Sequence, residues 1–299
     1  MADDVLVMGE SLVDVVRAAD GSTSEHAGGS AANVAVALAR LGRSVRFATS
    51  FADDPHGRMI AGHLDRAGVR LANQPHSIAR TSTAVATLDA DGAAHYEFDL
   101  EWVLDPPTVE APPSAVHVCS LGAVLSPGSD VVHAAVSRLR GSSLVSYDIN
   151  ARPVITGSGP DLLERVERMI AASDLVKASD EDLAALYPTL ALADAAHGLL
   201  ERGPAAVVVT RGGEGAVWFS GSDRVEVSAI PVPVADTIGA GDTFAAALVD
   251  GLLGRGDGRA DLAALDEAAV RKVLARAVRA AAVTVSRPGA DPPYASELP

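Results

Sequence analysis

Short apolar runs alternate with alanine- and leucine-rich stretches along most of the chain, and this alternation constrains the fold more than any other feature. The short runs predict buried strands, and the longer stretches predict helices. Parallel strands must be joined by crossovers of about a dozen or more residues, usually helices. The sequence therefore predicts an α/β fold whose mostly parallel sheet is covered on both faces. The predicted strands are residues 5–8, 45–49, 115–118, 144–149, 175–177 and 205–210, and the predicted helices are residues 31–41, 130–139, 161–172, 180–186 and 245–253.

Two stretches interrupt this alternation. Residues 81–98 alternate apolar and polar side chains around Asp91-Gly92, and residues 12–25 do so more weakly around Asp20-Gly21. An Asp-Gly pair between two such runs indicates a β-hairpin. We expect the two hairpins to form a small antiparallel β lid over residues 12–25 and 81–104, inserted into a single domain of residues 1–299. Surface decoration is the alternative that the pattern leaves open.

Composition limits the partners and the compartment. Asp and Glu number 39 against 24 Lys and Arg, so the formal net charge is −15. Such a surface repels phosphate backbones and anionic lipids, so neither nucleic acid nor a membrane is the expected partner. The single cysteine, Cys119, permits no intramolecular disulfide, and the sequence has neither a signal peptide pattern nor an apolar run of membrane-spanning length. We expect a soluble, cytoplasmic protein that binds any anionic ligand through a local device such as a helix N-terminus.

A glycine-rich loop between two acids is the most informative segment. Residues 236–244 read Asp-Thr-Ile-Gly-Ala-Gly-Asp-Thr-Phe and open the predicted helix of residues 245–253. Small residues at the start of a helix let an anion approach the backbone amides. Asp242, taken alone, is more typical of a helix N-cap. Because Asp236 brackets the same loop, the pair favours a general base that accepts a proton from an attacking hydroxyl.

Four motifs in this order carry a family resemblance. The sequence resembles the ribokinase-like sugar kinases, also called the phosphofructokinase-B family, along nearly its whole length. The loop from Asp236 to Asp242 fits the family's Asp-x-x-Gly-Ala-Gly-Asp signature. The resemblance implies a three-layer α/β/α fold with a mostly parallel sheet and a small β lid. The other three matches are Gly9-Glu10 with Asp14, Gly28-Gly29 with Asn33, and Thr210-x-Gly212-x-x-Gly215.

The resemblance implies a role for each matching residue in an ATP-dependent phosphorylation. Asp242 is implied to be the general base, in a reaction whose loose transition state depends chiefly on positioning and electrostatics. The amides of Gly239, Ala240 and Gly241 are implied to hold the transferred phosphoryl group. The implied sugar contacts are Asp14, Gly28, Gly29 and Asn33, and the implied ATP contacts are Thr210, Gly212, Gly215 and Gly241.

Two basic residues are further candidates for phosphate contacts. Asp148-x-Asn150-x-Arg152 follows a predicted strand end, where α/β sheets bind their ligands. Fructokinase-like and ketodeoxygluconate-kinase-like members share this triplet, which implies that Arg152 reaches the triphosphate; an isolated arginine is otherwise usually a solvated surface group. Lys177, one of only two lysines, ends another predicted strand, and a phosphate contact and a snorkelling side chain are equally open.

The expected metal sites rest on the resemblance. Where the family commonly has Asn-x-x-Glu, the chain has Ser179-Asp180-Glu181-Asp182, similar to the Lys-x-Ser variant of fructokinase-like members. This implies Ser179 on the ATP side and Asp182 as the Mg²⁺ acid, with Glu181 next; a capped helix with acids in its first turn is the alternative. Asp236 and the Ile238 carbonyl are implied to bind K⁺, and residues 283–290 resemble the segment under the adenine. The eight histidines show no zinc-binding spacing.

We therefore expect a homodimeric, Mg²⁺- and ATP-dependent kinase that phosphorylates the primary hydroxyl of a sugar and dimerises through the lid. Fructose is the first candidate, because Tyr96-x-Phe98 and residues 287–293 also look fructokinase-like. 2-Keto-3-deoxygluconate, ribose and nucleosides stay open, since one hydroxyl or methylene changes binding in an apolar pocket by only about 1–3 kcal/mol. A catalytically silent sugar-binding or regulatory protein is the alternative of another class. The intact base and glycine loop disfavour it.

Overall fold

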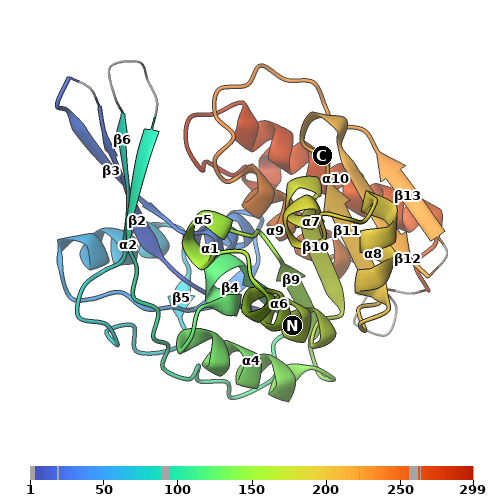
Figure 1. Cartoon of the computed structure of the whole chain (residues 1–299), viewed down its shortest axis with the longest axis horizontal. Helices are drawn as coiled ribbons and strands as arrows, with labels where there is room; N and C mark the ends of the chain where they lie inside the picture. Colours follow the sequence, from blue (N-terminus) through green and yellow to red (C-terminus); the bar gives the residue numbers. More distant parts are fainter. Residues whose placement is uncertain are drawn as a thin grey trace.

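A nine-stranded sheet forms the centre of the structure, a computed structural model that describes residues 4–18, 20–88, 94–221, 223–255, 262 and 264–298 (Figure 1). From β11 to β5 all neighbouring strands pair in parallel, and β12 and β13 extend one edge in antiparallel fashion. The carboxyl ends of the parallel strands meet at one edge, which is where α/β sheets bind ligands. In spatial order the strands are β13 (Asp223–Val227), β12 (Ala216–Ser220), β11 (Ala206–Thr210), β10 (Leu175–Ser179), β9 (Leu144–Asp148), β8 (Ala115–Cys119), β1 (Asp4–Met8), β4 (Ser44–Ala48) and β5 (Arg70–Leu71).

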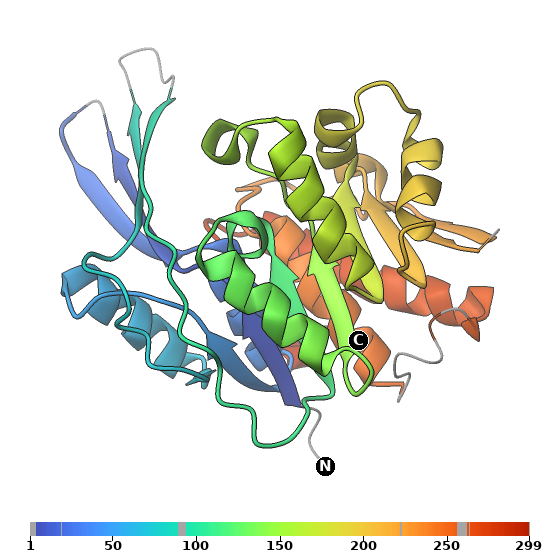
Figure 2. The same ribbon diagram turned by 60° about the horizontal axis from the view of Figure 1, so that its bottom comes forward.

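Helices cover both faces of this sheet, as the alternation predicts. Side chains alternate along β1, so Val5 and Val7 face one core layer and Leu6 and Met8 the other. Figure 2 shows the two layers, with the green helices in front of the sheet and the orange and red helices behind it. The first layer holds α1 (Ser30–Arg40), α2 (Pro55–Arg66), α9 (Ala240–Leu253) and α10 (Glu267–Val285), and the second holds α3 (Ser120–Val124), α4 (Gly128–Leu139), α6 (Pro160–Ala171), α7 (Asp180–Leu186) and α8 (Leu192–Leu200). The short elements are α5 (Pro153–Thr156), η1 (Gly212–Glu214) and η3 (Ala295–Glu297).

A second, four-stranded sheet projects from the main body at the upper left of Figure 1. Its strands, in spatial order, are β3 (Thr23–Gly28), β2 (Leu12–Arg17), β6 (Thr83–Leu88) and β7 (Ala94–Asp99). Each predicted hairpin is present as an antiparallel pair, and the parallel pairing of β2 with β6 joins the two hairpins. The Asp91-Gly92 turn predicted for the second hairpin lies outside the described residues. We call these four strands the small sheet.

The expected fold class is confirmed, and the sequence interpretation left several elements out. Mixed α/β architecture, the mostly parallel sheet and the separate small sheet all agree with expectation. The elements not predicted are α2, α3, α5, α8, α10, the edge strand β5, the antiparallel pair β12–β13 and the short turns η1 and η3. Among the helices of the described segments, none combines the length and the apolarity that crossing a bilayer requires.

Candidate active site

The N-termini of α1 and α9 meet at the buried carboxylate of Asp242. This residue lies in the first turn of α9 and is 8% exposed. The hydroxyl of Ser30 donates to Oδ1 at 2.7 Å, and Nδ2 of Asn33 donates to Oδ2 at 2.8 Å. Each carboxylate oxygen can accept a second hydrogen bond, so donors from α1 orient Asp242 and leave capacity for a substrate hydroxyl.

The predicted glycine loop forms the N-terminus of α9. Gly239 is the N-cap residue with φ +73°, and a Cβ there would lie 2.7 Å from the Cβ of Ala290. Only glycine fits this combination of left-handed backbone and close neighbour. Ala240 and Gly241 follow as the first helical residues, and first-turn amides have no acceptor within the helix. Together with the helix dipole, such amides could hold an anion beside Asp242, although the Ala240 amide already donates to the Thr237 carbonyl at 3.3 Å.

A buried ion pair lies behind this anion site. Nζ of Lys177 donates to Oδ2 of Asp148 at 2.7 Å, with the two side chains 5% and 0% exposed. A Cβ added to Gly241 would lie 3.5 Å from the same Nζ, so the ammonium adjoins the glycine loop. Burial raises the pKa of Asp148 to about 6, against the opposing effect of Lys177. Burial opposes the charged form of Lys177, but the neighbouring carboxylates together keep its pKa raised, so the ammonium stays charged.

The predicted sugar side of the site contains two more acids. A Cβ on Gly28 would lie 2.3 Å from Oδ2 of Asp14, so glycine makes room for this carboxylate. Burial raises the pKa of Asp14 to about 6; His26, opposite it on β3, lowers the pKa and Asp242 raises it. Glu10 accepts a hydrogen bond from the Gly122 amide at 2.7 Å, and burial raises its pKa to about 7. Gly29, which follows Gly28 in the sequence, is the N-cap residue of α1.

Glu10→Gln is expected to flatten the pH dependence of stability. The folded-state pKa of Glu10 is raised from 4.5 to about 7, so the folded protein binds the extra proton. The resulting stabilisation is complete at pH values below the pKa of Glu10 in the unfolded protein. It is lost as the pH rises through the pKa in the folded protein, and the loss amounts to about 3 kcal/mol. Between pH 4.5 and 7.5, urea unfolding should show a smaller fall in the free energy of unfolding for Glu10→Gln than for wild type. Exposed Glu97→Gln is the control, and equal slopes for Glu10→Gln and wild type would contradict the assignment.

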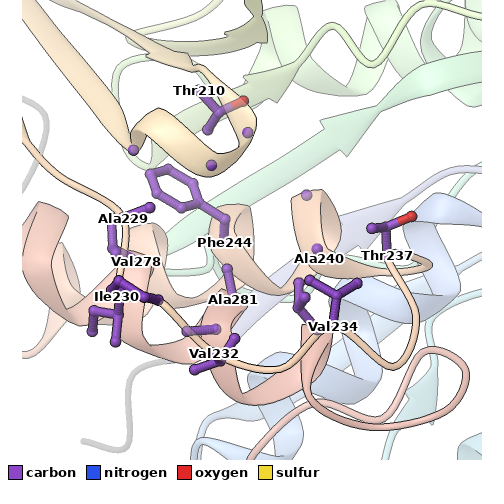
Figure 3. A pocket seen from close by; sticks show the side chains of 17 residues that line it. Thr210, Ala229, Ile230, Val232, Val234, Thr237, Ala240, Phe244, Val278 and Ala281 are labelled. Atoms are coloured by element: carbon purple, nitrogen blue, oxygen red, sulfur yellow. The ribbon is translucent and has the colours of Figure 1, made fainter.

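An apolar pocket of about 440 Å³ adjoins the glycine loop. Figure 3 shows Thr210 on one side, and Ile230, Val232 and Phe244 among the apolar side chains of the other walls. The size and apolar walls are typical of a small-molecule site. Three predicted ATP contacts, Thr210, Gly212 and Gly215, line it, and Ala240 and Gly241 link it to the anion site. The other lining residues are Gly213, Ala229, Pro231, Val234, Thr237, Val278, Ala281, Ala282 and Val285.

The remaining predicted ATP and Mg²⁺ residues surround the loop after β9. Ser179 and Asp182 form a capping box at the start of α7, and Asp182 Oδ1 also accepts from the Ala151 amide at 2.8 Å. Each oxygen of Asp182 thus already accepts one backbone amide. Arg152 is exposed, and its guanidinium donates to the Ala151 carbonyl at 3.0 Å and acts electrostatically on Glu10. Within the described ranges, no group of three His, Cys, Asp or Glu side chains could hold a metal ion.

Asp236 precedes the glycine loop and accepts two backbone hydrogen bonds there. Oδ1 accepts from the Ile238 amide at 3.0 Å, and Oδ2 accepts from the Gly289 amide at 2.9 Å. These bonds tie the loop to residues 283–290, the segment predicted to lie under the adenine, of which Val285 lines the pocket. The K⁺ site predicted at Asp236 and the Ile238 carbonyl stays a prediction.

Sequence reasoning missed two polar groups at the centre of the site. Ser30 donates to Asp242 and accepts from Nδ2 of Asn150, although as a helix-initiating serine it reads as an ordinary cap residue. His117 is buried beneath the site with Nδ1 3.2 Å from the Ser146 hydroxyl, and burial, with a smaller effect of Lys177, lowers its pKa to about 3. Its position inside a β-strand carries no sequence signal.

Comparisons with known proteins point to one family. The model of the pfkB family carbohydrate kinases matches residues 2–297. A fructokinase from Rhizobium leguminosarum bv. trifolii is 34% identical over 289 residues, covering 89% of this chain and 85% of that protein. A crystal structure of fructokinase from Xylella fastidiosa has a TM-score of 0.87 at 27% identity, covering 99% of this chain and 97% of that one. Fructokinase from Vibrio cholerae O395, in fructose, ADP and calcium ion bound form, has a TM-score of 0.82 at 27% identity, covering 97% and 94%.

Proposed function

The chain belongs to the pfkB family of carbohydrate kinases and is an ATP-dependent sugar kinase, and we propose that its sugar is fructose. The observation that carries the catalytic assignment is the buried Asp242, oriented by Ser30 and Asn33 and next in sequence to Gly241, which lines the apolar pocket. The choice of fructose is supported by the fructokinase relatives, of which the Rhizobium leguminosarum protein is 34% identical and the Vibrio cholerae protein was crystallised with fructose and ADP.

In this proposal Asp242 accepts the proton of the attacking primary hydroxyl. The amides of Gly239, Ala240 and Gly241 hold the transferred phosphoryl group, and Lys177 adds positive charge behind them. Asp14 and the free hydrogen-bonding capacity of Asn33 orient the sugar hydroxyls, while Gly28 and Gly29 let the sugar lie against the backbone. Such groups act by positioning and electrostatics, which suits a loose transition state.

Mg²⁺ accompanies ATP in this proposal, with water between the metal and Asp182. Mg²⁺ usually keeps several waters and binds mainly through substrate phosphates, so it needs no cage of protein ligands. Asp182 suits a contact through water, because each of its oxygens already accepts a backbone amide. The exposed Glu181 is the next candidate, and Arg152, Ser179, Thr210, Gly212 and Gly215 complete the ATP side. K⁺ is assigned to Asp236 and the Ile238 carbonyl.

A panel of acceptors tests the proposed substrate. ATP consumption should be measured with fructose, ribose, 2-keto-3-deoxygluconate and adenosine, each with Mg²⁺, with a chelator, and in sodium or potassium buffer. We expect the highest kcat/KM with fructose, loss of activity with the chelator, and a higher rate in potassium. A higher kcat/KM with another acceptor would reassign the substrate, and activity with none would favour the silent sugar-binding protein. Equal rates in both buffers would remove the K⁺ site.

We also propose that the small sheet is a lid over the sugar and a homodimer contact within a single domain. Asp14 lies on β2, so in this proposal the same strand covers the sugar and contacts it. On β7, Tyr96 and Phe98 share one face and stack at a centroid distance of 6.1 Å, and Tyr96 is 61% exposed. A small sheet with exposed edges and an exposed aromatic ring gains from packing against a second copy. Lid closure excludes water from the transfer site.

The variant with Tyr96→Ser and Phe98→Ser should be more monomeric and hydrolyse more ATP without sugar. Light scattering measures the first effect, and the ratio of sugar-free ATPase to kinase activity measures the second. Tyr294→Ser, which alters another exposed tyrosine packed on Arg40, is the matched control. The proposal fails if the wild-type protein is a monomer and the double substitution leaves the ratio of sugar-free ATPase to kinase activity unchanged. The small sheet would then be surface decoration.

The cytoplasm is the proposed compartment. Cys119, the only cysteine of the sequence, is free and buried. A reducing environment suits such a thiol. Fractionation of the source cells with an antibody to the chain tests this assignment, and recovery from an oxidising compartment would contradict it.

A further inference from the structure

The buried hydroxyl of Ser30 joins Asp242 to the loop after β9. It lies 2.7 Å from Asp242 Oδ1 and 2.9 Å from Asn150 Nδ2. A serine hydroxyl carries one proton, and an amide NH₂ group can only donate. The Ser30 oxygen therefore accepts from Asn150, and its single proton is available for the carboxylate. Among the residues that the structure describes, the one other hydrogen-bond partner of the Ser30 hydroxyl is the sulfur of Cys119 at 3.3 Å, a weaker acceptor.

Two hydrogen bonds fix the backbone at Asn150, which carries this side-chain amide. Asn150 has φ +38°, a left-handed conformation that Asn tolerates better than most residues. The hydroxyl of Ser120 donates to the backbone carbonyl of Asn150 at 3.1 Å. The next backbone amide, that of Ala151, donates to the carboxylate of Asp182 at 2.8 Å. The loop that carries Arg152 is thus anchored to the first turn of α7, and it presents a preoriented donor to Ser30.

We infer that Ser30 is a positioning residue that commits its proton to Asp242 only while the loop after β9 holds Asn150 in place. The inference rests on the proposed role of Asp242 as general base. With Asn150 in place, the Ser30 hydroxyl orients the carboxylate and stabilises its charged form. When Asn150 moves away, the hydroxyl can turn toward Cys119, and Asp242 loses one of its two donors. The loop that is proposed to contact ATP thereby controls the orientation and the charge of the Asp242 carboxylate.

Five other titratable groups act on Asp242, and the test must keep them constant. They are Glu10 after β1, Asp14 on β2, Cys119 on β8, Asp148 on β9 and Lys177 on β10. Each could contribute to a pH profile of the enzyme. Because none is altered in the variants below, a difference between a variant and wild type reports the Ser30 contact.

The pH dependence of kcat for Ser30→Ala is the decisive measurement. Removing a hydrogen bond from the charged form of a carboxylate favours its protonated form. We therefore expect the acidic limb of kcat to move up by about one pH unit, with kcat about tenfold lower on that limb. The KM for the sugar should stay within about twofold, because Asn33 and Asp14 are unchanged. Ser30→Thr retains a hydroxyl and should restore the wild-type limb.

A matched control and a second variant keep the inference falsifiable. Ser129 is a buried serine in the first turn of α4 whose hydroxyl has no partner in the described parts of the chain, so Ser129→Ala should leave the profile unchanged. Asn150→Gly tolerates the left-handed backbone and removes the amide donor to Ser30 without adding a titratable group. We expect the same shift as in Ser30→Ala, and no further shift when the two are combined.

The contrary outcomes separate this inference from the proposed function. If Ser30→Ala lowers kcat by one factor at every pH, or if its effect adds fully to that of Asn150→Gly, Ser30 has only a structural role. All assays use the best acceptor of the panel, so a substrate other than fructose does not affect the test. If Asp242→Asn keeps wild-type turnover, the base assignment fails, and this inference fails with it. If Asp242→Asn is inactive and Ser30→Ala matches wild type throughout, only the inference fails.

Discussion

Replacing Asp242 with Asn is expected to lower turnover by a factor on the order of 10²–10⁴ while the sugar and ATP still bind. The amide has nearly the size of the carboxylate but cannot accept the proton of the attacking hydroxyl. Its oxygen can still accept from either Ser30 or Asn33, so the contact between α1 and α9 is largely kept. Steady-state kinetics measure the loss, and calorimetry with the sugar and a non-hydrolysable ATP analogue measures the retained binding.

The matched control for this substitution is Asp250→Asn on the same helix. Asp250 is also a buried acid, 3% exposed, but Arg43 and Arg276 hold it at 2.6 and 2.8 Å, at the end of α9 away from the glycine loop. Its substitution should lower the melting temperature and leave turnover close to wild type. A folded Asp242→Asn protein that turns over at the wild-type rate would exclude Asp242 as the base.

The second large effect is expected for Lys177→Met, which removes one partner of the buried ion pair. Asp148 is 0% exposed, so its charge would remain without compensation, a change that typically costs about 3–5 kcal/mol. Burial already raises the pKa of Asp148 to about 6 beside the lysine, so the unpaired carboxyl is protonated more easily at low pH. The loss in free energy of unfolding, measured in urea, should therefore be smaller at pH 5 than at pH 7.5.

Two further proteins separate stability from catalysis at Lys177. The variant with Lys177→Met and Asp148→Asn contains neither charge, so much of the stability should return. Its KM for ATP should stay raised, because the ammonium beside Gly241 is still missing. Lys272→Met alters the only other lysine, an exposed one, and should change neither quantity. Recovery of wild-type kinetics in the double variant would make Lys177 a purely structural residue.

Much of the fold was predictable because its signals are local. Predicted strands such as residues 5–8 and 144–149 agree with β1 and β9 to within a residue, since their apolar runs are buried on both faces. The edge strand β13 has a single buried residue, Val225, and therefore no such run. The parallel pairing of β2 with β6 could not be predicted either. The two hairpins are distant in sequence, and they lie side by side only because the main sheet places them next to each other.

The part of the site that lies within one contiguous motif could be predicted from the sequence. The part that forms where helices distant in sequence meet could not. The glycine loop and Asp242 are contiguous, so their spacing alone indicates an anion site with an acid. Ser30 becomes part of the site only because the N-terminus of α1 faces that of α9, which no local pattern encodes. For Lys177 the sequence left a phosphate contact and a snorkelling side chain open. The structure shows a buried partner for Lys177: Asp148, which lies directly opposite it on the neighbouring strand β9.

The parallel pairing of β2 with β6 has a consequence for the order of folding. Val13 lies opposite Thr83, and the chain between them forms β3, α1, β4, α2 and β5. Closing so long a loop is entropically unfavourable until the intervening elements are fixed, and nonlocal pairings of this kind form slowly. The two hairpins can each form early, but their docking must wait for the β4–β5 edge of the main sheet. Substrate-binding competence is therefore expected to appear after the core has formed, as a late kinetic event in refolding.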